Sequence, residues 1–332
     1  MQVRVFGRTG MQLSVLGFGC GAVGGLMVRG DPLDQERAIA RAIDAGVNYF
    51  DTAVQYGNGE SEKNLGRVLQ KLKPAHAVVG TKVRLPPADR GRIAEAITQS
   101  LEASLSRLRL DRVDIFHLHN SITATGDGPA LSVAQVLDEV LPAFERLRQQ
   151  GKTRFLGFTA VGDTAALHLA IDSAAFDSAQ VAYNMLNPSA AVELPENYPA
   201  QDYGRLFDHT QAASVGVVVI RVLAGGALTG STERNPIASP APEPIGSAKS
   251  YDVDVERARR LMPLVTEGFA ASLTEAATRF ALSHPAVGTI LVGTATPREF
   301  EDALAAVQIG PLPSAALDRL SALRRTFAGE PR

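Results

Sequence analysis

The sequence predicts an α/β fold, a (β/α)8 TIM barrel, from three observations. Eight short apolar segments alternate with helical segments, and the connections are long enough for parallel crossovers. No change in composition marks a linker, so residues 1–332 are expected to form a single domain. Three of the apolar segments end abruptly in a polar residue, and the carboxyl ends of barrel strands are where ligands bind.

The chain begins with a segment typical of a β-hairpin, residues 3–14, with Gly7 and Gly10 around its turn. We expect this hairpin to plug the amino-terminal end of the barrel. Three long loops, at residues 121–130, 185–202 and 230–252, are expected to line a pocket at the opposite face. The eight barrel strands are expected at residues 13–18, 47–50, 77–81, 113–118, 154–158, 179–182, 216–222 and 288–292.

The helical segments show apolar residues at a spacing of three and four, with glycine after several of their ends. Asp163 is expected to cap the helix that follows it, and Ser272 with Glu275 forms a capping box. The helices are expected at residues 34–45, 60–72, 92–108, 133–149, 164–173, 203–214, 255–266, 273–283 and 297–306.

The composition excludes several classes of protein. The net charge is −2 and charges of both signs are interspersed, so no basic surface for nucleic acid is expected. No run approaches the roughly 18 apolar residues of a membrane span. Cys20 is the only cysteine, which rules out an internal disulfide and favours a cytoplasmic location. The histidines show no metal-binding spacing, so no metal is expected.

The polar residues at the strand ends form a candidate catalytic site. Asp51, Lys82 and His119 end three successive strands, and Tyr56 lies in the loop after Asp51. A lysine beside a tyrosine stabilises the phenolate, and a carboxylate beside that lysine keeps it charged. A neutral histidine can polarise a carbonyl oxygen. The set suits carbonyl reduction or alcohol oxidation, and the hydride must come from a nicotinamide cofactor.

His117 has the same strand parity as His119 but lies one layer deeper, so we interpret it as a structural residue. The glycine-rich stretch GFGCGAVGG is only loosely similar to a dinucleotide fingerprint and is interpreted as backbone that leaves room at the mouth of the first strand.

The chain resembles the aldo-keto reductases over nearly its whole length. The branch that it resembles is that of the L-galactose and D-threo-aldose dehydrogenases. The motifs that carry the resemblance are LGFGCG (16–21), FDTAVQYGNGESEKNLG (50–66), GTK (80–82), LEASLSRLRLDRVDIFHLH (101–119), GKTRFLGFT (151–159), QVAYN (180–184), AGGALTG (224–230) and ILVGTATPREFED (290–302).

The resemblance implies a catalytic tetrad of Asp51, Tyr56, Lys82 and His119, and an NAD(P)(H) cofactor. In the family a Ser-Asn pair usually binds the nicotinamide amide, and this chain has Thr159-Ala160 there. Gln180 matches the third residue that contacts this amide. Ile220 or Arg221 stands where the family often has a tyrosine on which the nicotinamide ring stacks. The residues expected at the cofactor are Thr159, Gln180, Ile220, Arg221, Leu223, Gly225, Gly293, Thr294, Arg298 and Asp302.

The choice between NAD and NADP depends on the turn after the eighth strand. Relatives that prefer the 2′-phosphate commonly carry lysine and arginine where this chain has Gly293 and Glu299. Glu299 also completes a capping box with Thr296. Its charge opposes a phosphate, while Thr294 and Arg298 offset part of that repulsion. The sequence therefore predicts that NAD is at least tolerated.

The substrate is expected to be a small carbonyl compound or a sugar, with Phe18, Cys20, Tyr183 and Tyr198 as candidate contacts. Two other functions stay open. Lys82 could form a Schiff base, as in an aldolase. The chain could also be a regulatory subunit that keeps the barrel and the cofactor, as potassium-channel β subunits do. The oligomeric state is not predicted.

Overall fold

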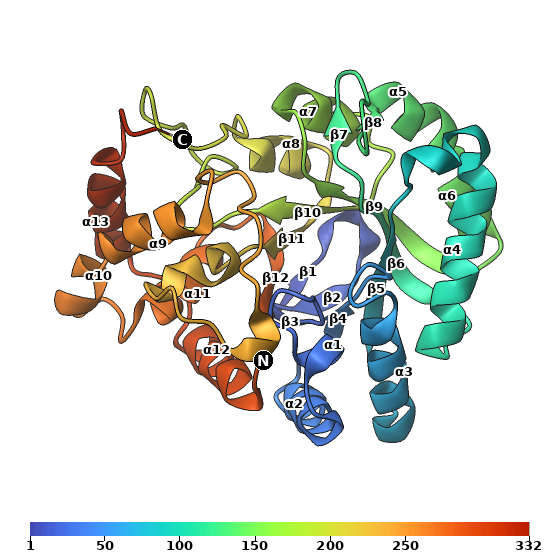
Figure 1. Cartoon of the computed structure of the whole chain (residues 1–332), viewed down its shortest axis with the longest axis horizontal. Coiled ribbons are helices and arrows are strands. Elements are labelled where there is room, and N and C mark those ends of the chain that lie inside the picture. The colour runs from blue at the N-terminus through green and yellow to red at the C-terminus, as the bar shows by residue number, and fades with distance from the viewer. Residues whose placement is uncertain (332) are drawn as a thin grey trace.

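The computed structural model describes residues 1–331, and the expected domain ends at Arg332, which lies outside the described residues. Eight parallel strands close into a barrel in chain order, with helices on the outside (Figure 1). This arrangement confirms the predicted (β/α)8 barrel. The barrel strands are β3 (Leu16–Gly19), β4 (Tyr49–Asp51), β5 (Val78–Val83), β6 (Val113–Leu118), β9 (Thr153–Ala160), β10 (Ser178–Ala182), β11 (Gly216–Ile220) and β12 (Val287–Gly293).

The barrel strands are buried on both faces because one face packs inside the barrel and the other against helices. In β11 the sequence is GVVVI, which reads as a continuous β-branched run, as parallel strands buried on both sides usually do. Phe50 of β4 points outward, where its ring lies 6.1 Å from that of Phe18. Residues 49 and 51 of the same strand therefore point inward.

Eight helical connections follow the barrel strands, and most begin within a few residues of the predicted positions. None of the helices in residues 1–331 combines the length and the apolar character needed to cross a membrane. The connecting helices are α2 (Pro32–Asp44), α3 (Glu60–Leu72), α4 (Ile93–Leu108), α5 with α6 (Val133–Gln135 and Leu141–Gln149, joined by a π-helical turn at Val136–Val140), α7 (Thr164–Asp172), α8 (Leu206–Ala212), α11 (Leu273–Ala281) and α12 (Pro297–Ile309).

Further elements lie outside the eight strand–helix units of the barrel. The structure adds α1 (Leu26–Arg29), α9 (Tyr251–Arg259), α10 (Pro263–Thr266) and the terminal helix α13 (Ser314–Arg325), and a small pair of strands, β7 (Ile122–Thr123) and β8 (Leu131–Ser132). Four 3-10 turns lie in the loops, at Gly7–Thr9, Pro87–Arg92, Ala224–Thr229 and Pro236–Ala238.

Several predicted elements are corrected by the structure. The expected strand at residues 13–18 is two strands, because β2 (Gln12–Ser14) belongs to the hairpin and β3 to the barrel. The expected helix at 255–266 is α9 and α10, which are separated before Pro263. The helix expected at 203–214 begins only at Leu206, because Arg205 before it has a left-handed backbone. Asp163 precedes α7 but does not cap it, since its carboxylate accepts from the Ala124 N–H instead.

The amino-terminal hairpin plugs the barrel as expected. Strand β1 (Val3–Val5) pairs antiparallel with β2, and between them Phe6 is fully buried. A Cβ atom on Gly216 or Gly288, at the starts of β11 and β12, would lie 2.6 Å or 2.7 Å from the Phe6 ring. Those two glycines therefore leave the space that the Phe6 ring fills at the closed end of the barrel.

A buried ion pair ties two outer helices to strand β5. The Glu62 side chain on α3 is fully buried, and its carboxylate accepts from Arg107 Nε of α4 and from Thr81 Oγ1 of β5, both at 2.6 Å. Thr81 directly precedes Lys82 in the strand. The outer face of β5 is thus fixed by a charged hydrogen-bond network while its inner face carries Lys82.

We predict that Arg107→Met lowers the free energy of unfolding by about 3 kcal/mol, because it leaves the Glu62 carboxylate buried without its partner. Urea unfolding followed by circular dichroism measures this loss. The matched control is Arg37→Met, which breaks a surface pair with Asp34 whose side chains are 73% and 42% exposed. The control should cost less than about 1 kcal/mol, and equal losses in the two variants would contradict the role of burial.

Candidate active site

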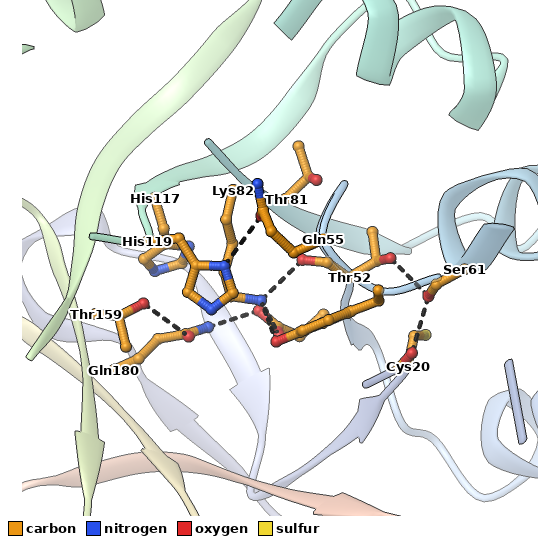
Figure 2. A network of polar contacts seen from close by, with 12 residues as sticks. Cys20, Thr52, Gln55, Ser61, Thr81, Lys82, His117, His119, Thr159 and Gln180 are labelled. Atoms are coloured by element: carbon orange, nitrogen blue, oxygen red, sulfur yellow. Dashed lines mark hydrogen bonds and ion pairs between the residues drawn. The ribbon is translucent and has the colours of Figure 1, made fainter. Parts of the chain in front are cut away.

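Four polar side chains meet at the carboxyl ends of β4, β5 and β6. Asp51 ends β4, Tyr56 lies in the loop behind it, Lys82 is in β5, and His119 follows β6. Lys82 Nζ donates to Asp51 Oδ1 at 2.5 Å and to the Thr52 carbonyl oxygen at 2.8 Å, and lies 3.2 Å from Tyr56 Oη (Figure 2). The structure thus brings together the residues that the sequence assigns to one site.

The loop that carries Tyr56 is fixed at both sides. Residues 57–59 all have positive φ angles, so the chain turns sharply from the strand into α3. The Ser61 hydroxyl at the start of that helix contacts Thr52 Oγ1 and donates to the Cys20 carbonyl oxygen, each at 2.8 Å. Ser61 was not predicted as a site residue, although the sequence places it in the first turn of the helix next to the loop.

The ion pair between Lys82 and Asp51 is almost completely removed from solvent, with side chains 0% and 4% exposed. Burial lowers the pKa of Lys82, but the Asp51 carboxylate and Tyr56 outweigh burial and raise that pKa above its usual value. Lys82 is therefore an ammonium ion at every ordinary pH, and its charge is held by Asp51.

Opposing influences act on Tyr56. Burial raises the pKa of its hydroxyl, while Lys82 lowers it, and burial wins, so the net pKa lies above the usual value. The lowering by Lys82 that the sequence predicts is present but does not reverse the sign. Tyr56 therefore keeps its proton at neutral pH. Its ring meets the His119 ring edge-on, with centroids 5.8 Å apart.

His119 is neutral in this environment. Burial, with help from Lys82 and Arg84, lowers the pKa of His119 to about 3. Its Nδ1 lies 3.2 Å from Gln55 Oε1, and the partner of Nδ1 decides which ring nitrogen holds the proton. With Gln55 Oε1 facing it, Nδ1 carries the proton and Nε2 is an acceptor. The reversed Gln55 amide, with its NH2 group towards Nδ1, would place the proton on Nε2, which could then donate to a substrate oxygen.

His117 lies beneath this site, as the sequence predicts. It is fully buried opposite Lys82 in the register of β5 and β6, and its Nε2 lies 3.0 Å from Ser178 Oγ. Burial lowers the pKa of His117 well below its usual value. A Cβ on Gly157 would lie 2.5 Å from the His117 ring, so that glycine leaves room for it. The structural role of His117 stays a prediction.

Asp51 has two further partners that the sequence analysis did not predict. Gln180 Nε2 and Tyr49 Oη donate to Asp51 Oδ2 at 2.6 Å and 3.0 Å. Tyr49 precedes Asp51 by two residues in a strand and therefore lies on the same face. That spacing was visible in the sequence, whereas the approach of Gln180, 129 residues away, required the barrel to close.

A cavity of about 700 Å³ opens above these side chains. Asp51, Tyr56 and His119 lie in its wall, while Lys82 and Tyr49 lie behind it. Seven of the residues expected at the cofactor line the cavity: Thr159, Gln180, Ile220, Arg221, Leu223, Gly225 and Gly293.

Three residues expected at the cofactor do not line the cavity. Thr294 is buried, and its backbone oxygen accepts from the Leu26 N–H. Arg298 and Asp302 pair with each other on the exposed side of α12, at 3.1 Å. Glu299 does line the cavity, and its carboxylate accepts from the Ala295 N–H at 2.7 Å. One of the backbone N–H groups expected to face an anion is thus already occupied.

The four candidate substrate contacts lie outside the cavity, so we withdraw them. Phe18 packs outward on Phe300 of α12, with ring centroids 4.9 Å apart, and Cys20 is fully buried. Tyr183 stacks on Phe280, and the Tyr198 hydroxyl donates to the Leu186 carbonyl oxygen.

The expected loop at 185–202 contributes no residue to the cavity wall. Loops 121–130 and 230–252 do contribute, through Ser121, Glu233, Arg234, Asn235, Ala238, Glu243, Ile245 and Tyr251.

The cavity fits a nicotinamide dinucleotide. Arg221 lines the cavity, and its Nη1 is buried without a hydrogen-bond partner among the described residues. A buried donor of this kind can bind an acceptor atom of a ligand. Much of the wall near β3, β11 and β12 is glycine, which lets a phosphate approach the backbone closely: Gly19, Gly21, Gly24, Gly225, Gly226 and Gly293. Residues 1–331 hold no cluster of three or more metal-binding side chains.

A barrel that carries a buried Asp–Lys pair against a tyrosine at its carboxyl face defines a class of oxidoreductase. The model of the aldo/keto reductase family matches residues 15–325. The chain therefore belongs to the aldo/keto reductase family and is an NAD(P)-dependent oxidoreductase. The predicted family membership is confirmed.

Individual relatives match most of the chain. The chain is 29% identical to L-galactose dehydrogenase of Arabidopsis thaliana, over 92% of this chain and 88% of that protein. It is 28% identical to a putative voltage-gated potassium channel subunit beta of Schizosaccharomyces pombe, over the same shares. An aldo-keto reductase from Bacillus halodurans, solved in its holo form, has the same fold, with a TM-score of 0.70, 24% identity and coverage of 97% and 96%.

We predict that Lys82→Met raises the pKa of Tyr56 further, because the phenolate loses its stabilising cation and Asp51 loses its counter-charge. In alcohol oxidation the rising limb of the pH–rate profile should move to higher pH. If turnover is too low, absorbance titration of tyrosinate gives the same pKa. Lys63→Met, which removes a lysine exposed on α3, serves as the control and should leave the limb in place.

Proposed function

We propose that this protein reduces a small aldehyde, ketone or aldose to the alcohol, with Tyr56 as the general acid. The observation that carries the proposal is the position of Lys82 Nζ, which bonds Asp51 on one side and lies 3.2 Å from Tyr56 Oη on the other. When bound, the cofactor supplies the hydride. Tyr56 supplies the proton, so the carbonyl gains both and becomes an alcohol.

The protonation state of Tyr56 supports reduction as the direction at neutral pH. Its raised pKa means that the hydroxyl holds the proton that reduction consumes. As the proton leaves, the phenolate forms beside the Lys82 ammonium, which stabilises it. Oxidation needs the phenolate instead, and so should become faster as the pH rises towards the pKa of Tyr56.

His119 completes the site by holding the carbonyl. When the Gln55 amide is reversed, so that its NH2 group faces His119 Nδ1, the neutral ring carries its proton on Nε2 and donates a hydrogen bond to the reacting oxygen. That bond orients the oxygen towards Tyr56 and adds to the stabilisation of negative charge on it. Because the pKa of His119 is about 3, this role does not depend on pH in the ordinary range.

Tyr56→Phe should lower kcat at least about 10²-fold, because the ring stays but the proton donor is lost. The affinity for the reduced cofactor, measured by the fluorescence of the cofactor, should change little. The assay screens aldoses, aldehydes and ketones with both cofactors, and Tyr198→Phe is the control for loss of a buried hydroxyl away from the cavity. Near-normal turnover in Tyr56→Phe would rule out this assignment.

The aldolase alternative conflicts with the charge on Lys82. A Schiff base requires a neutral amine, but Asp51 and Tyr56 raise the pKa of Lys82 above its usual value. Reduction with borohydride in the presence of a carbonyl substrate should therefore leave Lys82 unmodified. A covalent adduct at Lys82 would favour the aldolase.

A regulatory role is the second candidate, because the chain resembles a putative potassium channel subunit beta along most of its length. A complete set of catalytic side chains around the cavity supports turnover rather than a purely regulatory role. Cofactor binding without turnover on any aldose, aldehyde or ketone would favour the regulatory subunit.

We infer that NAD(H) is accepted at least as well as NADP(H). The carboxylate of Glu299 lines the cavity at the amino terminus of α12, where a 2′-phosphate would meet its charge. Arg298, which could offset that charge, points away and pairs with Asp302. The balance of charges at this turn is therefore less favourable to NADP(H) than the sequence alone indicates.

Glu299→Gln should improve kcat/KM for NADPH relative to NADH by about 10-fold, which is roughly 1.4 kcal/mol, since it removes one negative charge and keeps the shape. Glu301→Gln removes a carboxylate of the same helix that pairs with Arg41 outside the cavity, and is the matched control. The wild type should show a kcat/KM for NADH at least equal to that for NADPH. A wild-type preference for NADPH that Glu299→Gln does not change would contradict this interpretation.

A further inference from the structure

Tyr49 is a buried tyrosine directly beneath the catalytic aspartate. It is the first residue of β4, two before Asp51, so both side chains point into the barrel. Its side chain is fully buried and belongs to the interior cluster that includes Phe6 and Leu13 of the amino-terminal plug. Tyr49 therefore lies between the closed end of the barrel and the reacting end.

The Tyr49 ring fits a slot made by glycines on both neighbouring strands. A Cβ on Gly17 of β3 would lie 2.9 Å from the Tyr49 ring, and a Cβ on Gly80 of β5 would lie 2.7 Å from its hydroxyl oxygen. Any other residue at either position would meet the ring or its hydroxyl. The two glycines thus leave one place for the ring and hold its hydroxyl under Asp51.

That hydroxyl completes the hydrogen bonding of the Asp51 carboxylate. Lys82 donates to Oδ1, while Gln180 and Tyr49 donate to Oδ2. Gln180 lines the cavity, where a ligand can compete for its amide, but Tyr49 does not. Tyr49 is therefore the donor on Oδ2 that a bound ligand leaves in place.

We propose that Tyr49 is a positioning residue, which fixes the Asp51 carboxylate so that Lys82 stays aligned with Tyr56. The inference rests on the proposed function of Tyr56 as the proton donor. A neutral donor suits this task, because it holds the carboxylate without adding a second cation that would compete with Lys82 for it.

The electrostatic effect on Tyr56 has a definite sign. The Asp51 charge raises the pKa of Tyr56, and the Tyr49 hydroxyl dipole offsets part of that charge. Removing the hydroxyl should therefore raise the pKa of Tyr56. The titratable and charged groups that face this cluster are Cys20 after β3, Tyr49 and Asp51 of β4, Lys82 of β5, His117 of β6, His119 after β6, and Arg221 after β11.

The test is Tyr49→Phe, which removes the hydroxyl and keeps the ring in its slot. We expect kcat for carbonyl reduction to fall about 10-fold, with the KM for cofactor changed less than about twofold, because alignment is lost rather than binding. Absorbance titration of tyrosinate, with Tyr56→Phe subtracted to isolate Tyr56, should show a rise in its pKa of about half a unit or more.

A double-mutant cycle separates positioning from a general structural effect. In an Asp51→Asn background, Tyr49→Phe should no longer move the Tyr56 titration, because the carboxylate through which Tyr49 acts is gone. Tyr198→Phe removes another buried hydroxyl and should move neither kcat nor the titration. Gly80→Ala, which would displace the Tyr49 hydroxyl, should act in the same direction as Tyr49→Phe and serves if that variant does not fold.

The outcomes distinguish this inference from the proposed function. Unchanged kcat and an unchanged Tyr56 titration in Tyr49→Phe would overturn the positioning role while reduction by the wild type stands. A shifted titration in a protein that reduces no carbonyl would support the positioning role and defeat the proposed function. An equal effect of Tyr49→Phe in the wild-type and Asp51→Asn backgrounds would also overturn the inference.

Discussion

The buried ion pair between Lys82 and Asp51 is the interaction on which the site depends. Removing two charges from water is costly unless every remaining lone pair and proton finds a partner. Here the Lys82 ammonium donates to the Asp51 carboxylate and to the Thr52 carbonyl oxygen, and it faces the Tyr56 hydroxyl. The Asp51 carboxylate also accepts hydrogen bonds from Gln180 and Tyr49. The barrel must therefore close and bring β10 opposite β4 and β5 before these charges are fully hydrogen-bonded, which couples the folding of the barrel to its chemistry.

The sequence was sufficient to predict the barrel and the meeting of Asp51, Tyr56, Lys82 and His119 at one site, because both follow local rules. Apolar runs alternate with amphipathic helices, and a polar residue that ends a buried strand is conspicuous, as Asp51, Lys82 and His119 are. The sequence was not sufficient to predict which residues line the cavity. Phe18 follows the strand parity that faces the helices, and Tyr183 packs on Phe280 of α11, neither of which is visible without the register of the closed barrel.

The hydrogen-bond partners of Asp51 also divide into one that local spacing indicates and one that depends on closure of the barrel. Tyr49 could have been inferred from its spacing of two residues, whereas Gln180 arrives from β10 across the barrel. Cap geometry also depends on tertiary context, since the Asp163 carboxylate bonds Ala124 rather than its own helix. Local patterns therefore located most of the elements, while the fold decided several of their ends and which side chains meet.

Cys20 has a practical consequence for work on this protein. Its thiol is fully buried, points at the Phe18 carbonyl oxygen, and has a pKa raised far above its usual value by burial and by Asp51. Thiol reagents need an accessible thiolate, so the native chain should behave as if it were cysteine-free under labelling conditions. A cysteine introduced on the loop at 230–252 could then carry a single fluorophore or spin label at the cavity wall, without the need to replace Cys20.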